Sequence, residues 1–218
     1  TFALVRELSH TPQIGSVRLS AVGTSSLTAL KAFLQGEQYF RRSEWDSAIT
    51  WYEKALAIDS NFPLANAQLG ETYGWSHASG DSLEIVYTMR AARNNRGLAP
   101  RDSLIIVAES LSAAIDDPKG DPQEVRHRRR LFAASELAAQ RYPDDPFVLY
   151  KLGDARYHYG QGRTFGVPAE KLLEGFDRAI AADSTFTPAY IHAIQLAFRL
   201  GGTEGGRRYL HLYLAQNP

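Results

Sequence analysis

The sequence contains no cysteine and a single methionine among its 218 residues. Without cysteine the chain has neither disulfides nor thiolate metal sites. No apolar run approaches the ~20 residues that a membrane-spanning helix requires, and no targeting segment is visible. An excess of charge is also absent, because 24 basic side chains balance 24 acidic ones. A nucleic-acid-binding protein normally carries a basic excess, so we expect neither a nucleic-acid partner nor a direct membrane span.

The chain does contain enough apolar residues, 44%, to form a folded core. Its length allows one or two domains. A cysteine-free chain suits a reducing cytoplasm and an oxidising periplasm equally, so the compartment stays unknown. Since the first residue is Thr1 and not Met, we expect the chain to be processed or trimmed, and whether an anchor or a neighbouring domain lies upstream stays open.

Amphipathic helical patterns follow one another along the chain in pairs. The first pair, Leu27–Arg42 and Glu44–Asp59, breaks near Ser43, and Ser25 or Ser26 can cap it. The later helices are expected at Phe62–Gly74, Leu83–Asn95, Ser103–Ala114 after a cap at Asp102, Gln123–Arg141, a stretch from Leu149, Ala169–Ala182, Pro188–Leu200 and Glu204–Gln216.

Small and aromatic residues recur at fixed spacing inside these pairs. Gly36 precedes Tyr39 by three positions, and Ala48, Tyr52 and Ala55 follow in the second helix. This spacing resembles the 34-residue tetratricopeptide repeat, W-x₂-L-G-x₂-Y…A-x₃-F…P, although Ala32, Gln35 and Ser60 replace its Trp, Leu and Pro. The repeat ends at Ser184 and Pro218 are 218 − 184 = 34 residues apart. The residues expected to pack repeats together are Gly36, Tyr39, Ala48, Tyr52, Ala55, Leu69, Gly70, Tyr73, Leu152, Gly153, Phe176 and Ala179.

The resemblance to tetratricopeptide repeats implies an all-α fold, a right-handed α-solenoid of helical hairpins with a short non-repeat arm at the N-terminus. We place the arm, or the remnant of a preceding α/β domain, at residues 1–24 and the repeat domain, about four repeats with elongated central ones, at 25–218. Within the arm, Ser16–Val22 alternates as a short strand does. It would either lie on the repeats or pair with another chain.

The run from Gly15 to Trp75 is also similar to the C-terminal repeat region of bacterial multidomain signalling proteins, namely Ser/Thr kinases and nucleotide cyclases. That resemblance implies an interaction or sensory module. It transfers no catalytic residue, since no kinase signature is present.

Candidate chemistry in the sequence is weak. Gly160-x-Gly162-x₃-Gly166 lacks the strand and the GK[ST] ending of a phosphate loop. Asp154 and His158 share a helix face, but no second ligand pair has suitable spacing. We therefore expect no enzyme activity, no cofactor and no metal. The basic run Arg126–Arg130 is either a solvated helix face or a surface for an acidic partner, an anionic lipid surface or nucleic acid. The residues expected on the buried side of this helix are Val125, Leu131, Phe132 and Leu137.

The first helices of successive hairpins line the concave surface of a tetratricopeptide solenoid, where a peptide or protein partner binds. The inward-facing candidates are Phe33, Glu37, Phe40, Arg41, Glu71, Trp75, Tyr150, Asp154, Tyr157 and His158. Two interpretations stay open for them. Exposed aromatics flanked by carboxylates would anchor an apolar or basic peptide, or several of these side chains pack between repeats and never contact a ligand.

These features predict a non-catalytic protein–protein interaction scaffold. Two alternatives remain. The first is a structural subunit that self-assembles, as a possible homo-oligomer, or docks into a larger complex through its repeat ends and N-terminal arm. The second is a sensory or regulatory region of a bacterial signalling kinase or cyclase. The last helix, Glu204–Gln216, has too many apolar side chains to be a solvated cap, which favours the first alternative.

Overall fold

The computed structural model describes residues 19–76, 82–116, 122–161 and 165–216, and all of its regular elements there are helices. Their bounds are α2 (Leu19–Val22), α3 (Leu27–Phe40), α4 (Trp45–Ile58), α5 (Pro63–Ser76), α6 (Ser82–Arg93), α7 (Pro100–Ile115), α8 (Glu124–Arg141), α9 (Pro146–Tyr159), α10 (Ala169–Ala182) and α11 (Pro188–Leu214). The all-α fold class is confirmed. In these segments no helix is long and apolar enough to cross a membrane.

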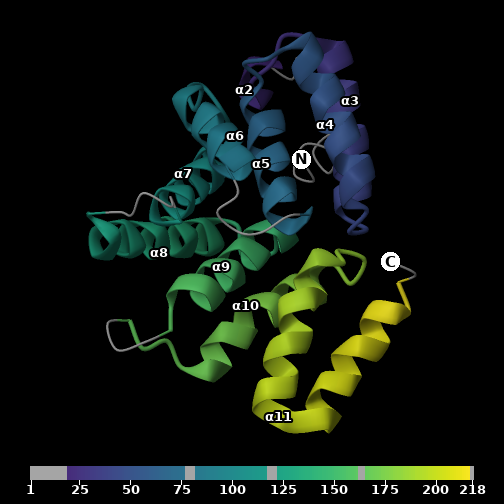
Figure 1. Cartoon of the computed structure of the whole chain (residues 1–218), viewed down its shortest axis with the longest axis vertical. Helices are drawn as coiled ribbons and strands as arrows, with labels where there is room; N and C mark the ends of the chain where they lie inside the picture. The colour runs from purple at the N-terminus through teal and green to yellow at the C-terminus, as the bar shows by residue number, and fades with distance from the viewer. Residues whose placement is uncertain (1–18, 77–81, 117–121, 162–164, 217–218) are drawn as a thin grey trace.

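Consecutive helices pair into antiparallel hairpins that stack side by side, which makes the chain an α-solenoid (Figure 1). Within the described residues the hairpins are α3/α4, α5/α6, α7/α8 and α9/α10, followed by α11, which folds back on itself at Gly202 (φ 59°). The α7/α8 hairpin has the longest helices of the four, 16 and 18 residues.

Local sequence explains how the first hairpin begins and turns. The Ser26 hydroxyl accepts a hydrogen bond from the Ala29 amide at 3.2 Å and caps α3. Ser43 adopts a positive φ of 60° at the turn into α4. A Cβ on Gly36 would lie 2.5 Å from the Tyr52 ring, so glycine is what allows α3 and α4 to approach so closely.

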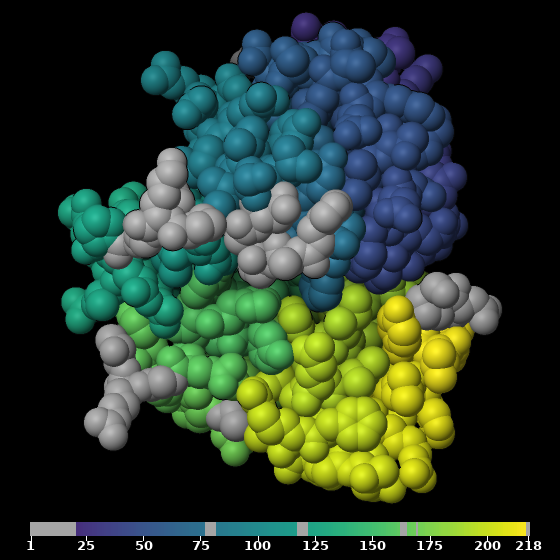
Figure 2. Space-filling model, in the orientation of Figure 1, coloured from purple at the N-terminus to yellow at the C-terminus, as the bar shows by residue number. Residues whose placement is uncertain are grey.

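The stack curls until its two ends meet. The backbone amide of Thr187, just before α11, donates to the Arg41 carbonyl at 3.0 Å, and the Ser43 and Thr187 hydroxyls are 2.7 Å apart. The Arg41 guanidinium forms an ion pair with Asp183. In Figure 1 the lower ends of α3 and α4 accordingly approach the start of α11. Figure 2 shows the resulting body, with the N-terminal hairpins above the C-terminal ones.

Three local predictions were wrong. Ser16–Val22 was expected as a strand, but the part of it that the structure describes, from Leu19, is the helix α2. Val22 packs into the helical core there, and the Ala21 carbonyl accepts a hydrogen bond from the Ala99 amide at 3.0 Å. Asp102 was expected to cap α7, which instead starts two residues earlier at Pro100, a residue suited to the first helical turn. Val125 was expected on the buried side of α8 and is 47% exposed.

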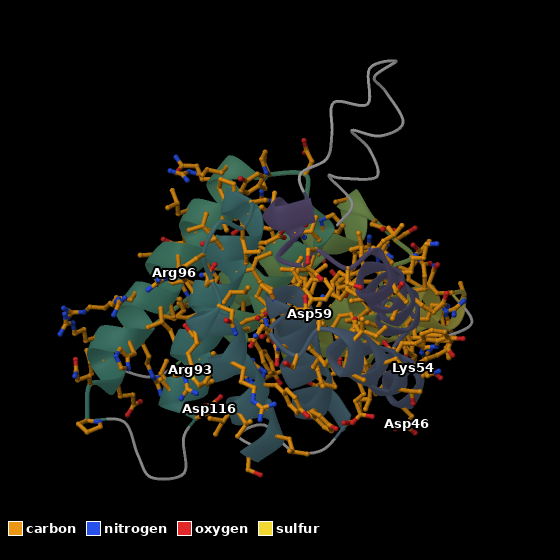
Figure 3. All side chains as sticks on the ribbon, turned by 90° about the horizontal axis from the view of Figure 1, so that it is seen from above. Asp46, Lys54, Asp59, Arg93, Arg96 and Asp116 are labelled. Carbon is orange, nitrogen blue, oxygen red and sulfur yellow. The ribbon has the colours of Figure 1, made fainter. Side chains whose placement is uncertain are left out.

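Charged side chains cover the outside of the stack. Asp46 and Lys54 of α4, and Arg96 beyond the end of α6, are exposed and are labelled in Figure 3. Arg126, Arg129 and Arg130 of α8 are exposed as well. The inner side of the stack, lined by α3, α5, α7 and α9, differs in character and contains the candidate site.

Candidate functional site

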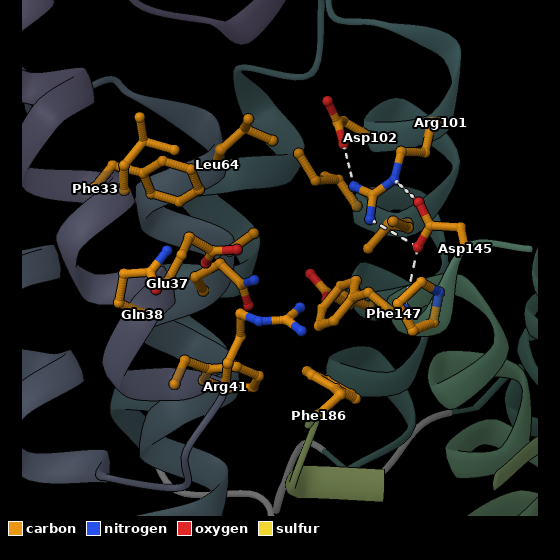
Figure 4. Close-up of a pocket in the computed structure, with 18 residues that line it drawn as sticks. Phe33, Glu37, Gln38, Arg41, Leu64, Arg101, Asp102, Asp145, Phe147 and Phe186 are labelled. Atoms are coloured by element: carbon orange, nitrogen blue, oxygen red, sulfur yellow. Dashed lines mark hydrogen bonds and ion pairs between the residues drawn. The ribbon is translucent and has the colours of Figure 1, made fainter. Parts of the chain in front are cut away.

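An apolar depression lies on the inner side, between α3, α5, α7 and the start of α9. We call it the inner groove. It holds about 850 Å³ including its open mouth. Its apolar lining consists of Phe33, Leu34, Phe40, Leu64, Ala67, Ile105, Ile106, Pro146, Phe147 and Phe186. Figure 4 shows Phe33, Glu37, Gln38 and Arg41 on one wall and Arg101, Asp102, Asp145 and Phe147 on the facing wall.

The charged groups of the inner groove are mostly held by partners within the chain. Arg101 donates to both carboxylate oxygens of Asp145, at 2.7 and 3.1 Å, and pairs with Asp102 at 2.5 Å. Asp145 also caps α9 by accepting from the Phe147 and Val148 amides at 3.0 Å. The Tyr52 hydroxyl donates to Glu37 at 2.7 Å. These charges shape the groove without needing a ligand to balance them.

A second depression, the polar hollow, adjoins the inner groove through Glu109, which lines both. It holds about 650 Å³ including its opening. Its lining residues come from α5, α6, α7, α9 and α11 and are Glu71, Gly74, Trp75, Glu84, Thr88, Glu109, Ser112, Lys151, Asp154, His158, Tyr159 and His192.

Lys151 is the centre of a carboxylate cluster in this hollow. Its ammonium lies 2.7 Å from Glu71, 3.5 Å from Asp154 and 3.8 Å from Glu109. Glu71 also accepts from the Tyr150 hydroxyl at 2.8 Å and the Trp75 indole at 3.3 Å. Such a network keeps a buried lysine charged.

Burial and charge act in opposite directions on the pKa values of these groups. Burial disfavours the charged form of Lys151, but Glu71 and Asp154 outweigh it and raise the lysine's pKa. Burial also opposes ionisation of Asp154, yet Lys151 and His158 hold its pKa well below the usual range. Glu109 differs, because burial raises its pKa to about 8 in spite of Lys151. At neutral pH, Glu109 is thus mostly protonated while Asp154 is ionised.

Two histidines converge on Asp154 at the edge of the polar hollow. Nε2 of His158 and Nε2 of His192 are 3.3 Å apart, and they lie 3.4 and 3.6 Å from Oδ1 of Asp154. Sequence analysis identified the Asp154–His158 pair but missed His192. The signal for it was the repeat period, because His192 follows His158 by 192 − 158 = 34 residues.

The predicted partner contacts separate into two groups. Phe33, Phe40 and Tyr150 are at most 1% exposed and pack within the chain, as the second interpretation describes; Phe40, for example, lies 6.2 Å from Phe147, ring centre to ring centre. Glu37 and Arg41 border the inner groove, whereas Glu71, Trp75, Asp154 and His158 line the polar hollow. Tyr157 lies beside this hollow, with its ring 4.2 Å from that of His192.

The residues expected to pack repeats lie mostly at helix contacts. A Cβ on Gly70 would lie 2.5 Å from the Thr88 hydroxyl, and one on Gly153 would lie 3.1 Å from the Phe176 ring. Tyr39 is half-buried. The remaining members of the set are buried, namely Ala48, Tyr52, Ala55, Leu69, Tyr73, Leu152, Phe176 and Ala179.

Comparison of sequences identifies one repeat directly. The tetratricopeptide-repeat family model matches residues 36–74, which run from α3 through α4 to α5. No curated protein is significantly similar to the chain in sequence.

Solved structures share the architecture. A thermophilic tetratricopeptide-repeat protein of Thermus thermophilus, TTC0263, is 15% identical to this chain and superposes on it with a TM-score of 0.54. The match covers 86% of this chain and 91% of the TTC0263 chain. MamA from Desulfovibrio magneticus RS-1 is 13% identical with 89% and 97% coverage and a TM-score of 0.41. YrrB, described as a tetratricopeptide-repeat protein with an unusual peptide-binding site, is 15% identical with 87% coverage of both chains and a TM-score of 0.40. The match to TTC0263 establishes the fold.

Proposed function

Because the chain carries a tetratricopeptide repeat and has the fold of tetratricopeptide-repeat proteins, we propose that it is a non-catalytic scaffold that binds a segment of a partner protein in the inner groove. The observation that carries the proposal is the apolar lining of this groove together with its open mouth. Monomeric proteins rarely leave concave apolar surface uncovered, and such surface marks sites of ligand or protein binding.

The chemistry of the groove favours an apolar anchor on the partner. Arg101 and Asp145 satisfy one another, and Glu37 is held by Tyr52, so a charged partner residue gains little from them. A bulky apolar side chain, in contrast, would cover Leu64, Ile105 and Phe147. Gln38, exposed at the rim, would contact the flanking backbone of the bound segment.

The structure also changes how the groove should be tested. Reversing the charges of Glu37 and Glu71 removes acceptors for Tyr52, Tyr150 and Lys151, so a loss of binding would report misfolding as well. Filling the groove from its rim avoids this. Gln38→Trp places an indole in the groove, while Gln35→Trp places the same side chain on the outer face of the same helix, beside Trp51 and Lys54.

The experiment selects peptides from a random display library on the wild-type chain and measures their affinity for both variants by fluorescence polarisation. We expect the selected peptides to share an apolar residue, to bind Gln38→Trp at least about tenfold more weakly, equivalent to about 1.4 kcal/mol, and to bind Gln35→Trp like the wild type. Peptides that bind Gln38→Trp undiminished, or a library that yields no binder, would contradict the proposal.

The last helix provides a second candidate interface, for self-assembly or docking. Phe198, Leu200, Leu212 and Leu214 of α11 are 41%, 43%, 40% and 56% exposed. In a solenoid, the outer face of a terminal repeat is where a further repeat would stack. Light scattering over a range of concentrations tests this second interface. The control variant is Leu83→Glu, because Leu83 on α6 is as exposed as Leu212. Association that is abolished by Leu212→Glu and kept by Leu83→Glu supports the interface, whereas a monomer at every concentration contradicts it.

A further inference from the structure

We propose that Asp154, His158 and His192 form a binding site for a divalent transition metal of the zinc class. The three side chains come from α9 and α11, on two successive repeats. A metal bound there would join these repeats at the edge of the polar hollow. The proposal is independent of whether the inner groove binds a peptide.

The geometry of the three ligand atoms fits a tetrahedral metal. Zinc binds histidine nitrogen and carboxylate oxygen at about 2.0–2.2 Å, which separates the ligand atoms of a tetrahedral site by about 3.3–3.6 Å. The three separations here are 3.3, 3.4 and 3.6 Å. The atoms therefore already form one face of a coordination tetrahedron. Three protein ligands leave the fourth position for water or an incoming side chain.

Neighbouring groups orient two of the three ligands. Nδ1 of His192 lies 2.9 Å from the side-chain oxygen of Gln195, so it donates its proton there and leaves the lone pair on Nε2, which faces Asp154. The Tyr157 hydroxyl donates to the same Gln195 oxygen at 2.8 Å and holds it in place. Lys151 lies 3.5 Å from Oδ2 of Asp154, which leaves Oδ1 for the metal.

The surroundings attract a cation. Glu71 and Glu84 line the same hollow as Asp154, and the closing turns of α5, α7 and α9 contribute the negative ends of their helix dipoles. Lys151 balances part of this charge through Glu71 and Asp154. The His158 side chain is 37% exposed and gives an ion a route from solvent.

Without a metal the same three side chains form a hydrogen-bonded cluster, in which one histidine donates to the other. The two arrangements differ in what they predict. A hydrogen-bonded cluster has no affinity for Zn²⁺ beyond that of scattered surface histidines, whereas a preformed metal site binds one ion tightly and loses it when one ligand is removed.

The experiment titrates the chelator-treated full chain with Zn²⁺ by calorimetry and with Co²⁺ by visible absorption. We expect one ion per chain, the visible bands of four-coordinate Co²⁺, and quenching of Trp75, whose ring is 5.0 Å from that of His192. His158→Ala and Asp154→Asn should weaken Zn²⁺ binding by at least tenfold. His211→Ala, which removes an exposed histidine elsewhere on α11, should leave it unchanged.

Circular dichroism of each variant checks that it is folded, and the exposed His158 is the substitution least able to disturb the core. Zn²⁺ should raise the melting temperature of the wild type and of His211→Ala but not of His158→Ala. Absence of saturable Zn²⁺ binding by the wild type, or wild-type affinity in folded His158→Ala, would overturn the proposal and leave the three residues as a hydrogen-bonded cluster.

Discussion

The inner groove and the polar hollow occupy the same inner helices yet have opposite chemistry. The groove presents Leu64, Ile105 and Phe147 and contains charges that pair with one another. The hollow places the carboxyl groups of Glu71, Asp154 and Glu109 around Lys151 and two histidines at its edge. The first is the proposed site for an apolar side chain of a partner, and the second contains the proposed cation site.

The difference arises from position along each helix. In α5 the opening turns, at Leu64 and Ala67, line the groove and the closing turns, at Glu71 and Trp75, line the hollow. In α9 Phe147 faces the groove, and Lys151, four residues further along the same face, faces the hollow. A change of residues one helical turn apart therefore separates an apolar depression from a polar one on the same helices.

The largest expected effect comes from removing the cation of the hollow. Lys151→Met leaves Glu71, Asp154 and Glu109 without their shared partner. We expect a loss of about 4 kcal/mol in the free energy of unfolding, because breaking a buried ion pair strands a charge. Urea denaturation measures this. The control Lys171→Met removes an exposed lysine of α10 and should change stability by less than about 0.5 kcal/mol; equal losses would show that the network does not stabilise the fold.

Glu109, which lines both depressions, gives the next effect, a dependence on pH. Its pKa is about 8 in the folded chain and 4.5 for the free side chain. The folded state therefore holds the proton more tightly, so this group's contribution is fully present below pH 4.5 and is lost as pH rises through about 8. We expect roughly 4 kcal/mol of stability to be lost over that interval, at about 1.4 kcal/mol per pH unit.

The matched variants for this prediction are Glu109→Gln and Glu136→Gln. Glutamine keeps the shape of a protonated Glu109, so its stability should fall less steeply between pH 5 and 8. Glu136→Gln changes an exposed residue of α8 and should leave the pH dependence of stability as it is in the wild type. Parallel stability–pH curves for the wild type and Glu109→Gln would indicate that Glu109 is ionised in the folded chain.

Much of the fold could be predicted from the sequence because repeats encode it locally. The pairing of Gly36 with Tyr52 and the cap at Ser26 depend on residues within one hairpin. The contact between Arg41 and Thr187 could not be predicted, since it joins residues 146 positions apart and depends on the summed curvature of every repeat. That closure is also why Phe40 is buried against Phe147 and Phe186 and does not face an open groove.

The candidate site was predictable only in part. Counting from the glycine positions predicted Glu37, Glu71 and Asp154 on the inner face, and these residues line the two depressions. It missed the facing wall at Arg101 and Ile105, because the elongated α7/α8 hairpin interrupts the 34-residue period. It also missed His192, although the period is intact there, since no sequence motif marks a histidine whose partners lie on the previous repeat.

A smaller effect is expected where α10 packs on α9, because α9 contributes residues to both depressions. Gly175 of α10 packs directly on Gly153 of α9, where a Cβ would lie 2.6 Å from the Gly153 backbone. Backbone cannot move aside as a side chain can, so Gly175→Ala should cost about 2 kcal/mol and weaken binding in both depressions. Gly201→Ala meets no atom within 4 Å and should stabilise the chain slightly. Thermal denaturation of the pair measures the contrast, and a stable Gly175→Ala would mean that α9 and α10 separate without consequence.

Trp75→Phe is expected to have the smallest effect and to distinguish the two depressions. The Trp75 indole donates to the Tyr150 hydroxyl at 3.0 Å, and its ring stacks on Trp45 at 5.4 Å. Phenylalanine retains a stacked ring but loses the donor, which should cost about 1 kcal/mol in urea denaturation. Trp51→Phe, on the outer face, should cost less. Because Trp75 lines only the hollow, the variant should bind groove-selected peptides with wild-type affinity; a parallel loss of peptide affinity would mean that the groove and the hollow act as one site.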